Sequence, residues 1–282
     1  MRCACSSGTA NSPRRPRVAE APGVQITADG AVLTITLRRP EMGNALRQND
    51  CAAVREAVLK VDGGSAVRAI LIRAEGRHFC TGADLVSANA ADVKPPAGHL
   101  SRGLAIGAHG MIDALWNCPV PTVAAAQGKC IGLGLHLAVV CDFTVAADDA
   151  TFLELFCQRG FSVDSGGSFL LPRLIGLRRA RQMLFRGTPV DAPTAVEWGL
   201  IDQALAPADL DAKATELAAE LAAGPTFSLG YTKRLLNNPA ADDLGETLRQ
   251  EAAAVEATVR SADFKEGLRA FTERRKPEFG GR

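Results

Sequence analysis

The sequence lacks any apolar run long enough to cross a membrane. A spanning helix needs roughly 20 mainly apolar residues, and the most apolar stretch, residues 131–141, contains one histidine and two glycines. Residues 1–22 also lack the apolar core of a secretory signal and are rich in serine, proline, alanine and arginine. We therefore expect a cytoplasmic protein with no membrane partner and a disordered N-terminal extension over residues 1–22.

The sequence also has no marked excess of positive or negative charge. The chain has 32 Lys and Arg residues against 31 Asp and Glu residues, which gives a net charge of +1. Its one basic cluster, residues 14–17, lies in the expected extension. Because nucleic-acid-binding domains carry concentrated positive charge, we do not expect a nucleic-acid partner.

Cysteine pairs and metal-ligand spacings are missing too. None of the eight cysteines forms a CxxC pair, and His78, His99 and His109 lack the spacing of a zinc site. Most cysteines lie in or beside apolar segments, where cysteine behaves as a small hydrophobe. We therefore expect a reducing environment, no disulfide framework and no metal. The cysteines in apolar surroundings are Cys51, Cys80, Cys118, Cys130, Cys141 and Cys157.

Two short glycine-containing segments, residues 75–85 and 127–136, carry the strongest chemical signal in the chain. Each follows an apolar run, residues 67–72 and 120–126, that is typical of a buried strand. Glycine after a strand lets the backbone approach a ligand closely, and an N–H at such a turn can donate to an anion. Two such donors in one cleft would form an oxyanion hole. Taken singly, each segment is equally typical of an ordinary strand-to-helix turn.

Segments with strand and helix patterns alternate along the chain. Residues 24–27 and 31–37 predict a hairpin that turns at Asp29 and Gly30, and residues 44–61 have helical spacing. Further strands are expected at 67–73, 120–126, 143–147 and 151–153, with helices at 133–140 and 167–175. Repeated strand-strand-helix units indicate stacked layers rather than an open dinucleotide-binding sheet.

Two regions depart from this alternation. Residues 85–104 contain Pro95 and Pro96, which oppose regular structure, and we interpret them as a mobile loop beside the substrate. From Asp209 onward the pattern is helical and includes residues 244–260 and 264–274. Such an appendage buries little surface alone, so it should pack on the core or on neighbouring subunits.

The two glycine-containing segments resemble the signature segments of the crotonase superfamily, the enoyl-CoA hydratase/isomerase family. Further matches lie at residues 37–46, 166–176, 195–202 and 263–275, so the resemblance covers residues 23–279. It implies an α/β fold in which residues 23–208 form a crotonase-like spiral of repeated ββα units with an acyl-CoA site. It also implies that residues 209–282 are a C-terminal helical oligomerisation region that builds a homotrimer or a hexamer of paired trimers.

The resemblance also implies a binding site for acyl-CoA, with no cofactor beyond the CoA of the substrate. It assigns the oxyanion donors to the backbone N–H groups of Ala83 and Leu133. Glycine is commoner at the second position, but a backbone donor depends little on its side chain. The implied substrate-binding residues form three groups. Arg77 would lie near the phosphates or adenine, and Thr81, Asp84 and Leu85 would line the pantetheine arm. Phe271 and Arg274 would lie near the adenine of an adjacent subunit. A plain surface role is the alternative for Arg77, and helix packing and a solvated charge are the alternatives for the last two.

The acid and base groups depart from the family pattern. Typical hydratases of the family have glutamates at the positions held here by His136 and Phe156. His136 could act as a base or orient water, and a buried, hydrogen-bonded histidine is the alternative; Phe156 would line an apolar acyl pocket. Asp164 matches a catalytic aspartate of the dienoyl-CoA isomerase branch, with helix capping as its competing role. Glu154 is an outside candidate, because strand or turn geometry decides whether it shares the face of Phe156.

We therefore expect an enzyme that stabilises a thioester enolate in a backbone oxyanion hole. The leading reaction is enoyl-CoA hydration in fatty-acid or related acyl-CoA metabolism. Two alternatives stay open, an enoyl- or dienoyl-CoA isomerase that uses Asp164, and a non-catalytic acyl-CoA-binding homologue that lost both glutamates. A hydrolytic triad of His136, Asp164 and Ser165 or Ser168 is conceivable, but no nucleophile motif supports it.

Overall fold

A hairpin begins the part of the chain that the structure describes. The structure is a computed structural model, and it describes residues 23–63, 66–84, 98–238 and 243–282. Strands β1 (Val24–Asp29) and β2 (Val32–Leu37) pair antiparallel. They turn at Gly30, whose φ of 55° suits a residue without a side chain. The predicted hairpin is confirmed, while the expected extension over residues 1–22 lies outside the described residues.

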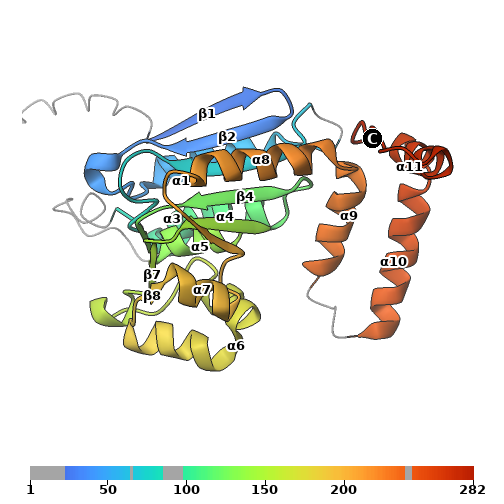
Figure 1. Cartoon of the computed structure of the whole chain (residues 1–282). Helices are drawn as coiled ribbons and strands as arrows, with labels where there is room; N and C mark the ends of the chain where they lie inside the picture. Colours follow the sequence, from blue (N-terminus) through green and yellow to red (C-terminus); the bar gives the residue numbers. More distant parts are fainter. Residues whose placement is uncertain (1–22, 64–65, 85–97, 239–242) are drawn as a thin grey trace, which may run out of the picture.

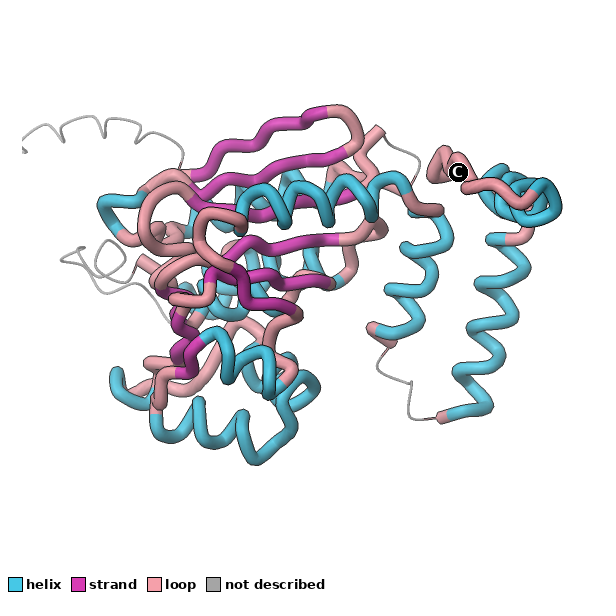
Figure 2. Tube along the Cα trace, viewed as in Figure 1, coloured by secondary structure: helices cyan, strands magenta, loops and turns pink. Residues whose placement is uncertain are grey.

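Six strands form the main sheet, in the order β1-β2-β3-β4-β6-β9. Strands are magenta in Figure 2. From β2 onward neighbouring strands are parallel, and the central strands are buried, as a parallel sheet covered on both faces requires. The larger hydrophobic core lies on one face, and α8 (Leu210–Ala223) covers the other (Figure 1). The remaining strands of this sheet are β3 (Ala69–Ala74), β4 (Thr122–Ala126), β6 (Phe143–Ala147) and β9 (Gln203–Leu205).

A second, three-stranded sheet consists of β5 (Lys129–Ile131), β7 (Thr151–Leu153) and β8 (Val190–Asp191). β4, β5 and α5 (Leu133–Val139) form one strand-strand-helix unit, and β6, β7 and α6 (Gly167–Arg186) form the next. Corresponding strands of the two units pair in parallel, β4 with β6 and β5 with β7. This repetition brings α5 and α6 into contact.

Several helix boundaries differ from the sequence expectation. α1 spans Gln48–Leu59 rather than residues 44–61, because the Asp50 carboxylate accepts from the backbone N–H of Arg47 and closes the first turn there. α6 continues past residue 175 through a kink at Gly176, whose φ of 73° favours glycine. The other helical segments of the core are η1 (Pro40–Met42), α3 (His99–Ile106), α4 (Ala108–Trp116), η2 (Cys157–Arg159) and α7 (Ala192–Trp198).

The expected irregular loop was wrong for its last part. Helix α3 starts at His99, directly after Gly98, so the two prolines at 95 and 96 precede the helix rather than prevent it. The rest of the expected loop, residues 85–97, lies outside the described residues.

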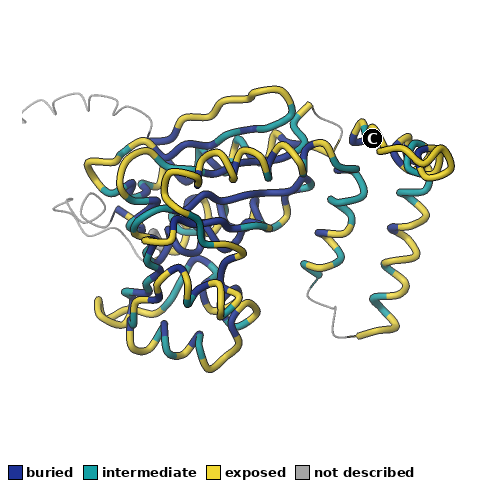
Figure 3. Tube along the Cα trace, in the orientation of Figure 1, coloured by how far each residue is buried: buried dark blue, intermediate teal, exposed yellow. Residues whose placement is uncertain are grey.

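The C-terminal region is helical, as expected, and consists of α8, α9 (Thr226–Leu236), α10 (Leu244–Thr258) and α11 (Ala262–Glu273). α8 packs on the main sheet, whereas α10 and α11 extend away from it, at the right of Figure 1. Large apolar side chains on these last two helices are exposed (Figure 3), namely Leu244, Leu248, Val255, Phe264, Leu268 and Phe271. In the described ranges, no helix is both long enough and apolar enough for a membrane span.

Candidate active site

The two glycine-containing segments lie side by side. The N–H of Cys80 donates to the carbonyl of Lys129 (3.2 Å), and the N–H of Ile131 donates to the carbonyl of Cys80 (3.0 Å). A Cβ at Gly134 would lie 2.2 Å from that same Cys80 oxygen, so only glycine lets α5 begin so close to the first segment. Backbone pairing between the two turns therefore explains how residues far apart in sequence share one site.

Ala83 and Leu133 follow these paired turns, and both line one pocket of about 60 Å³. Leu133 is the first residue of α5, so its N–H has no partner within the helix. Within the described ranges, neither this N–H nor that of Ala83 donates a hydrogen bond to another protein group. Two unpaired backbone donors at one pocket are the arrangement that an oxyanion hole requires.

Apolar side chains form most of the remaining pocket wall. Phe156 is 7% exposed and packs edge-to-face against Phe161, with ring centroids 5.1 Å apart. Sequence reasoning missed Leu104, which lies in the segment that was expected to be irregular, and Ala108, which follows that segment. It also missed Arg159, for which no motif gave a signal. Other residues that line the pocket include Leu104, Ala108, Ile131, Leu155 and Arg159.

Among the described residues, Asp164 is the only one with a carboxylate side chain that lines this pocket. Its Oδ1 accepts a hydrogen bond from Ser165 Oγ (2.7 Å), and Ser165 has a left-handed φ of 50°, which is strained for a residue other than glycine. The N-cap of α6 is Gly166, and no side chain caps it. Asp164 therefore does not have the helix-capping role that was its alternative, and it lines the same pocket as Ala83 and Leu133.

His136 is fully buried and is not among the residues that line the pocket. Its Nε2 lies 2.8 Å from Oε1 of Glu154, and both side chains are 0% exposed. Within the described part of the chain, Nδ1 of His136 and Oε2 of Glu154 have no hydrogen-bond partner. The ring of Phe156 lies parallel to the imidazole at 5.9 Å. The structure thus gives His136 the buried position that was the alternative to a catalytic one.

Arg77, expected near the phosphates or adenine, and the residues expected along the pantetheine arm have different surroundings. Thr81 lines the pocket, and Arg77 is exposed. Asp84 is buried and pairs with Arg39, whose guanidinium nitrogen lies 3.1 Å from Oδ2, so its carboxylate stabilises the turn after the first segment. Leu85 lies outside the described residues.

The two residues expected near an adjacent adenine lie on α11. Phe271 is 82% exposed, and Arg274 forms the left-handed C-cap of the helix. Figure 1 shows α11 beyond α9 and α10, at the right of the view, whereas α5 lies to the left of these helices. A contribution of these residues to the site of their own chain would require a different placement of α11, whereas a contribution to a neighbouring subunit would not.

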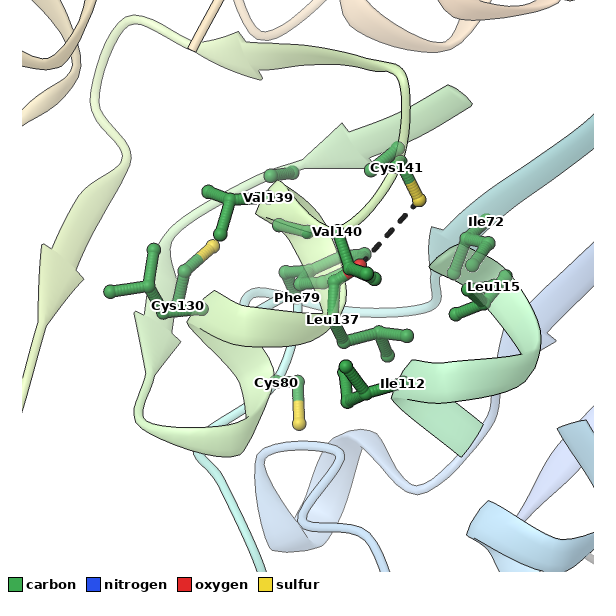
Figure 4. Close-up of a cluster of buried hydrophobic side chains, with 14 of the residues drawn as sticks. Ile72, Phe79, Cys80, Ile112, Leu115, Cys130, Leu137, Val139, Val140 and Cys141 are labelled. Atoms are coloured by element: carbon green, nitrogen blue, oxygen red, sulfur yellow. Dashed lines mark hydrogen bonds between the residues drawn. The ribbon is translucent and has the colours of Figure 1, made fainter. Parts of the chain in front are cut away.

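Buried thiols surround α5 (Figure 4). Burial raises the pKa of Cys80 and of Cys141 to about 12, and it raises the pKa of Cys130 well above its usual value. The Sγ of Cys141 donates to the carbonyl of Leu137 (3.5 Å). Because the thiolate is the reactive form, these cysteines are poor nucleophiles and act as packing residues. In the described ranges, no cluster of three or more His, Cys, Asp or Glu side chains could hold a metal ion.

Comparisons with known proteins cover nearly the whole chain. A family model described as enoyl-CoA hydratase/isomerase matches residues 27–282. The 1,2-epoxyphenylacetyl-CoA isomerase of Escherichia coli K12 is 35% identical over 251 residues, covering 89% of this chain and 95% of that protein. The trans-2-decenoyl-[acyl-carrier-protein] isomerase of Streptococcus mutans is 31% identical over 254 residues, covering 90% and 96%. The crystal structure of an enoyl-CoA hydratase from Polaromonas sp. JS666 has a TM-score of 0.83 at 30% identity, covering 91% and 99%.

The fold and the pocket define a mixed α/β enzyme with a crotonase-type core and a helical C-terminal region. The chain belongs to the enoyl-CoA hydratase/isomerase family. This confirms the family resemblance, the fold class and the expectation of an acyl-CoA enzyme that were drawn from the sequence.

Proposed function

We propose that the protein moves a carbon-carbon double bond in an enoyl-CoA thioester, with Asp164 as the single acid-base group. The observation that carries this proposal is the composition of the pocket wall. Asp164 shares the wall with both candidate oxyanion donors, Ala83 and Leu133, whereas His136 and Glu154 are buried behind it. One carboxylate beside one oxyanion hole is sufficient for a proton transfer between two carbons of the same substrate.

In the proposed reaction the carboxylate of Asp164 removes a proton from the carbon at one end of the allylic system. The electron pair moves onto the thioester carbonyl and gives a dienolate, whose oxygen accepts hydrogen bonds from the N–H groups of Ala83 and Leu133. The protonated carboxyl then returns the proton to the carbon at the other end of the system. Atoms and charges balance without water, and no cofactor is needed beyond the CoA of the substrate.

Hydration, the reaction favoured by sequence alone, is less well supported by the pocket. Water addition needs one group to take a proton from water and a second group to protonate the α-carbon. Typical hydratases of the family supply two glutamates, and here their positions hold His136, which is buried, and Phe156, which is apolar. Of the proteins named above, the Streptococcus mutans relative is by name an isomerase of a decenoyl thioester, whereas the Polaromonas protein is by name a hydratase.

The test is the variant Asp164→Asn, assayed with a 3-enoyl-CoA for isomerisation and with a 2-enoyl-CoA for hydration. We expect wild-type protein to catalyse the first reaction faster, and Asp164→Asn to lower its kcat by about a thousandfold with KM nearly unchanged, since general acid-base catalysis contributes about 10²- to 10⁴-fold. Asp113→Asn is the matched control, because Asp113 lines only the neighbouring cavity of about 490 Å³ that also reaches Asp164. Hydration that outpaces isomerisation, or an active Asp164→Asn variant, would contradict the proposal.

The C-terminal helices bear on the oligomeric state of the protein. We propose that residues 209–282 form the oligomerisation region of a trimer or of paired trimers, in which Phe271 and Arg274 reach the nucleotide bound to a neighbouring subunit and Arg77 serves the nucleotide of its own. The exposed apolar side chains of α10 and α11 support this, since large apolar patches commonly mark interfaces. Sedimentation velocity should give a particle of three or six chains, and Phe271→Ser should reduce that mass. A wild-type monomer would overturn this part.

A further inference from the structure

The buried pair of His136 and Glu154 is the least expected feature beside the pocket. Nothing in the reaction proposed above uses it, yet it is completely buried and has one hydrogen bond, with one nitrogen and one oxygen left unpaired among the described groups. Burial of polar groups is costly unless their hydrogen bonds are made. Replacement of such pairs by apolar residues is often neutral or stabilising, so stability alone does not account for this pair.

The contacts of the pair reach both halves of the site. On one side, the N–H of His136 donates to the carbonyl of Gly132 (2.9 Å), and the N–H of Gly132 donates to the carbonyl of Leu153 (2.9 Å), the residue before Glu154. Gly132 directly precedes Leu133, the candidate oxyanion donor. The pair therefore connects the start of α5 to the end of β7.

On the other side, the imidazole packs against the start of α6. A Cβ on Gly167 would lie 2.3 Å from Nε2 and 2.5 Å from Cε1 of His136, so the ring is in direct contact with the glycine backbone. The N–H of Gly167 donates to the carbonyl of Asp164 (3.1 Å). The orientation of the imidazole thus determines where the turn that carries the Asp164 carboxylate can lie.

We propose that His136 and Glu154 are a positioning pair that sets the separation between the Leu133 N–H and the Asp164 carboxylate. The inference rests on the function proposed above. Glu154 holds the imidazole in one orientation through its hydrogen bond, and the imidazole holds the Asp164 turn against α5. The parallel ring of Phe156 lies between the imidazole and the pocket, so the pair acts through other residues rather than on substrate. A misplacement of about 1 Å in such a geometry can reduce catalysis about a hundredfold.

The test compares four variants with wild-type protein in the isomerisation assay, with thermal melting as the folding control. The double variant His136→Leu/Glu154→Leu should fold with an unchanged or raised Tm, while its kcat falls by about 10- to 100-fold and KM stays within about threefold. Glu154→Gln keeps an acceptor for the imidazole, so its kcat should stay within about threefold of wild type. Glu154→Leu removes that acceptor and should lower kcat at least tenfold. His136→Gln should lower kcat about tenfold, because the acyclic amide lacks the ring atom Cε1 that lies against Gly167.

Each outcome decides the proposal. Full kcat in the double variant would show that the pair only fills space and would overturn the inference. A loss in His136→Gln as large as that in Asp164→Asn, together with loss of one limb of the pH-rate profile, would show that His136 takes part in the chemistry directly. If the double variant His136→Leu/Glu154→Leu does not fold, the difference in kcat between Glu154→Gln and His136→Gln tests the positioning role. A wild-type protein with no isomerase activity would instead contradict the function proposed above, so the two failures are distinguishable.

Discussion

Two polar pairs, Lys233 with Asp142 and His136 with Glu154, differ in how completely their hydrogen bonds are made. At the junction with α9, Lys233 Nζ lies 2.8 Å from Oδ2 of Asp142 and 3.1 Å from the carbonyl of Leu115. The same Oδ2 accepts from the backbone N–H and the hydroxyl of Thr122 (2.8 and 2.9 Å). Beside the pocket, His136 and Glu154 make one hydrogen bond, and each has a further polar atom without a partner in the described residues.

The contrast separates a structural role from a functional one. A well-connected network such as that of Lys233 and Asp142 stabilises the position of one helix, here α9 against the strands of the main sheet. A buried polar pair with unmade hydrogen bonds costs stability, and such exceptions in native proteins commonly occur where function requires a particular geometry. The expectations below test this difference from the largest effect to the smallest.

We expect the largest effect from Gly134→Ala, which changes the backbone contact beside the pocket and replaces no residue of the Lys233–Asp142 or His136–Glu154 pair. Its Cβ would clash with the Cys80 carbonyl at 2.2 Å, so the paired turns that present Ala83 and Leu133 must separate. We expect kcat/KM to fall at least a hundredfold, equivalent to about 2.7 kcal/mol. Gly103→Ala is the control, because its Cβ would meet no atom closer than 3.9 Å. Similar activities of the two alanine variants would show that close approach of the turns is not required.

An intermediate effect is expected for Lys233→Met. It leaves Asp142 without its cation, and loss of one partner of a fully buried pair costs about 3 to 5 kcal/mol. Because Asp142 is 25% exposed, we expect a smaller loss of about 2 kcal/mol in the free energy of unfolding, measured by urea denaturation, with kcat unchanged.

The exposed pair of Lys213 and Glu216 gives the matched control for that measurement. Their side chains are 55% and 66% exposed, and surface pairs contribute at most about 1 kcal/mol. Lys213→Met should therefore change stability very little. A large loss of kcat in Lys233→Met would remove the distinction between a structural and a functional pair.

We expect the smallest effect in the rate of thiol labelling at Cys118, near Lys233, and at Cys80, in the paired turns. Burial raises the pKa of Cys118, near Lys233, and the pKa of Cys80 in the paired turns. Alkylation at neutral pH, followed by peptide mapping, should modify the exposed Cys157 at once and leave both buried thiols unmodified. In Lys233→Met, Cys118 should react sooner than in wild type while Cys80 does not. Equal acceleration at both positions would indicate global rather than local opening.

The sequence predicted the backbone of the site better than its side chains. The turns that carry Ala83 and Leu133 follow apolar strands and contain glycines, and they pair with each other in the structure, whereas the oxyanion roles of the two residues came from the family resemblance and stay predictions. The helix at 99–106 was not foreseen, because prolines at 95 and 96 obscured a helix that begins only after them.

Glu154 shows why the side-chain directions in the site could not be predicted from the sequence. It follows β7, which ends at Leu153, and precedes η2, for which Phe156 is the N-cap. Both Glu154 and Phe156 contact the same imidazole, since Glu154 pairs with Nε2 of His136 and the ring of Phe156 stacks on it, but only Phe156 lines the pocket. The direction of a side chain at the junction of two short elements depends on tertiary packing, which local pattern does not encode.

The backbone origin of the two candidate donors has a consequence for the evolution of such a protein. Every amino acid except proline presents an N–H, so the proposed anion-binding role of positions 83 and 133 does not depend on the identity of their side chains. Natural variation around the pocket can therefore change which acyl group fits, or which atom receives a proton, without rebuilding the part that makes the thioester reactive. A lineage with this architecture can acquire a new reaction through a few surrounding substitutions.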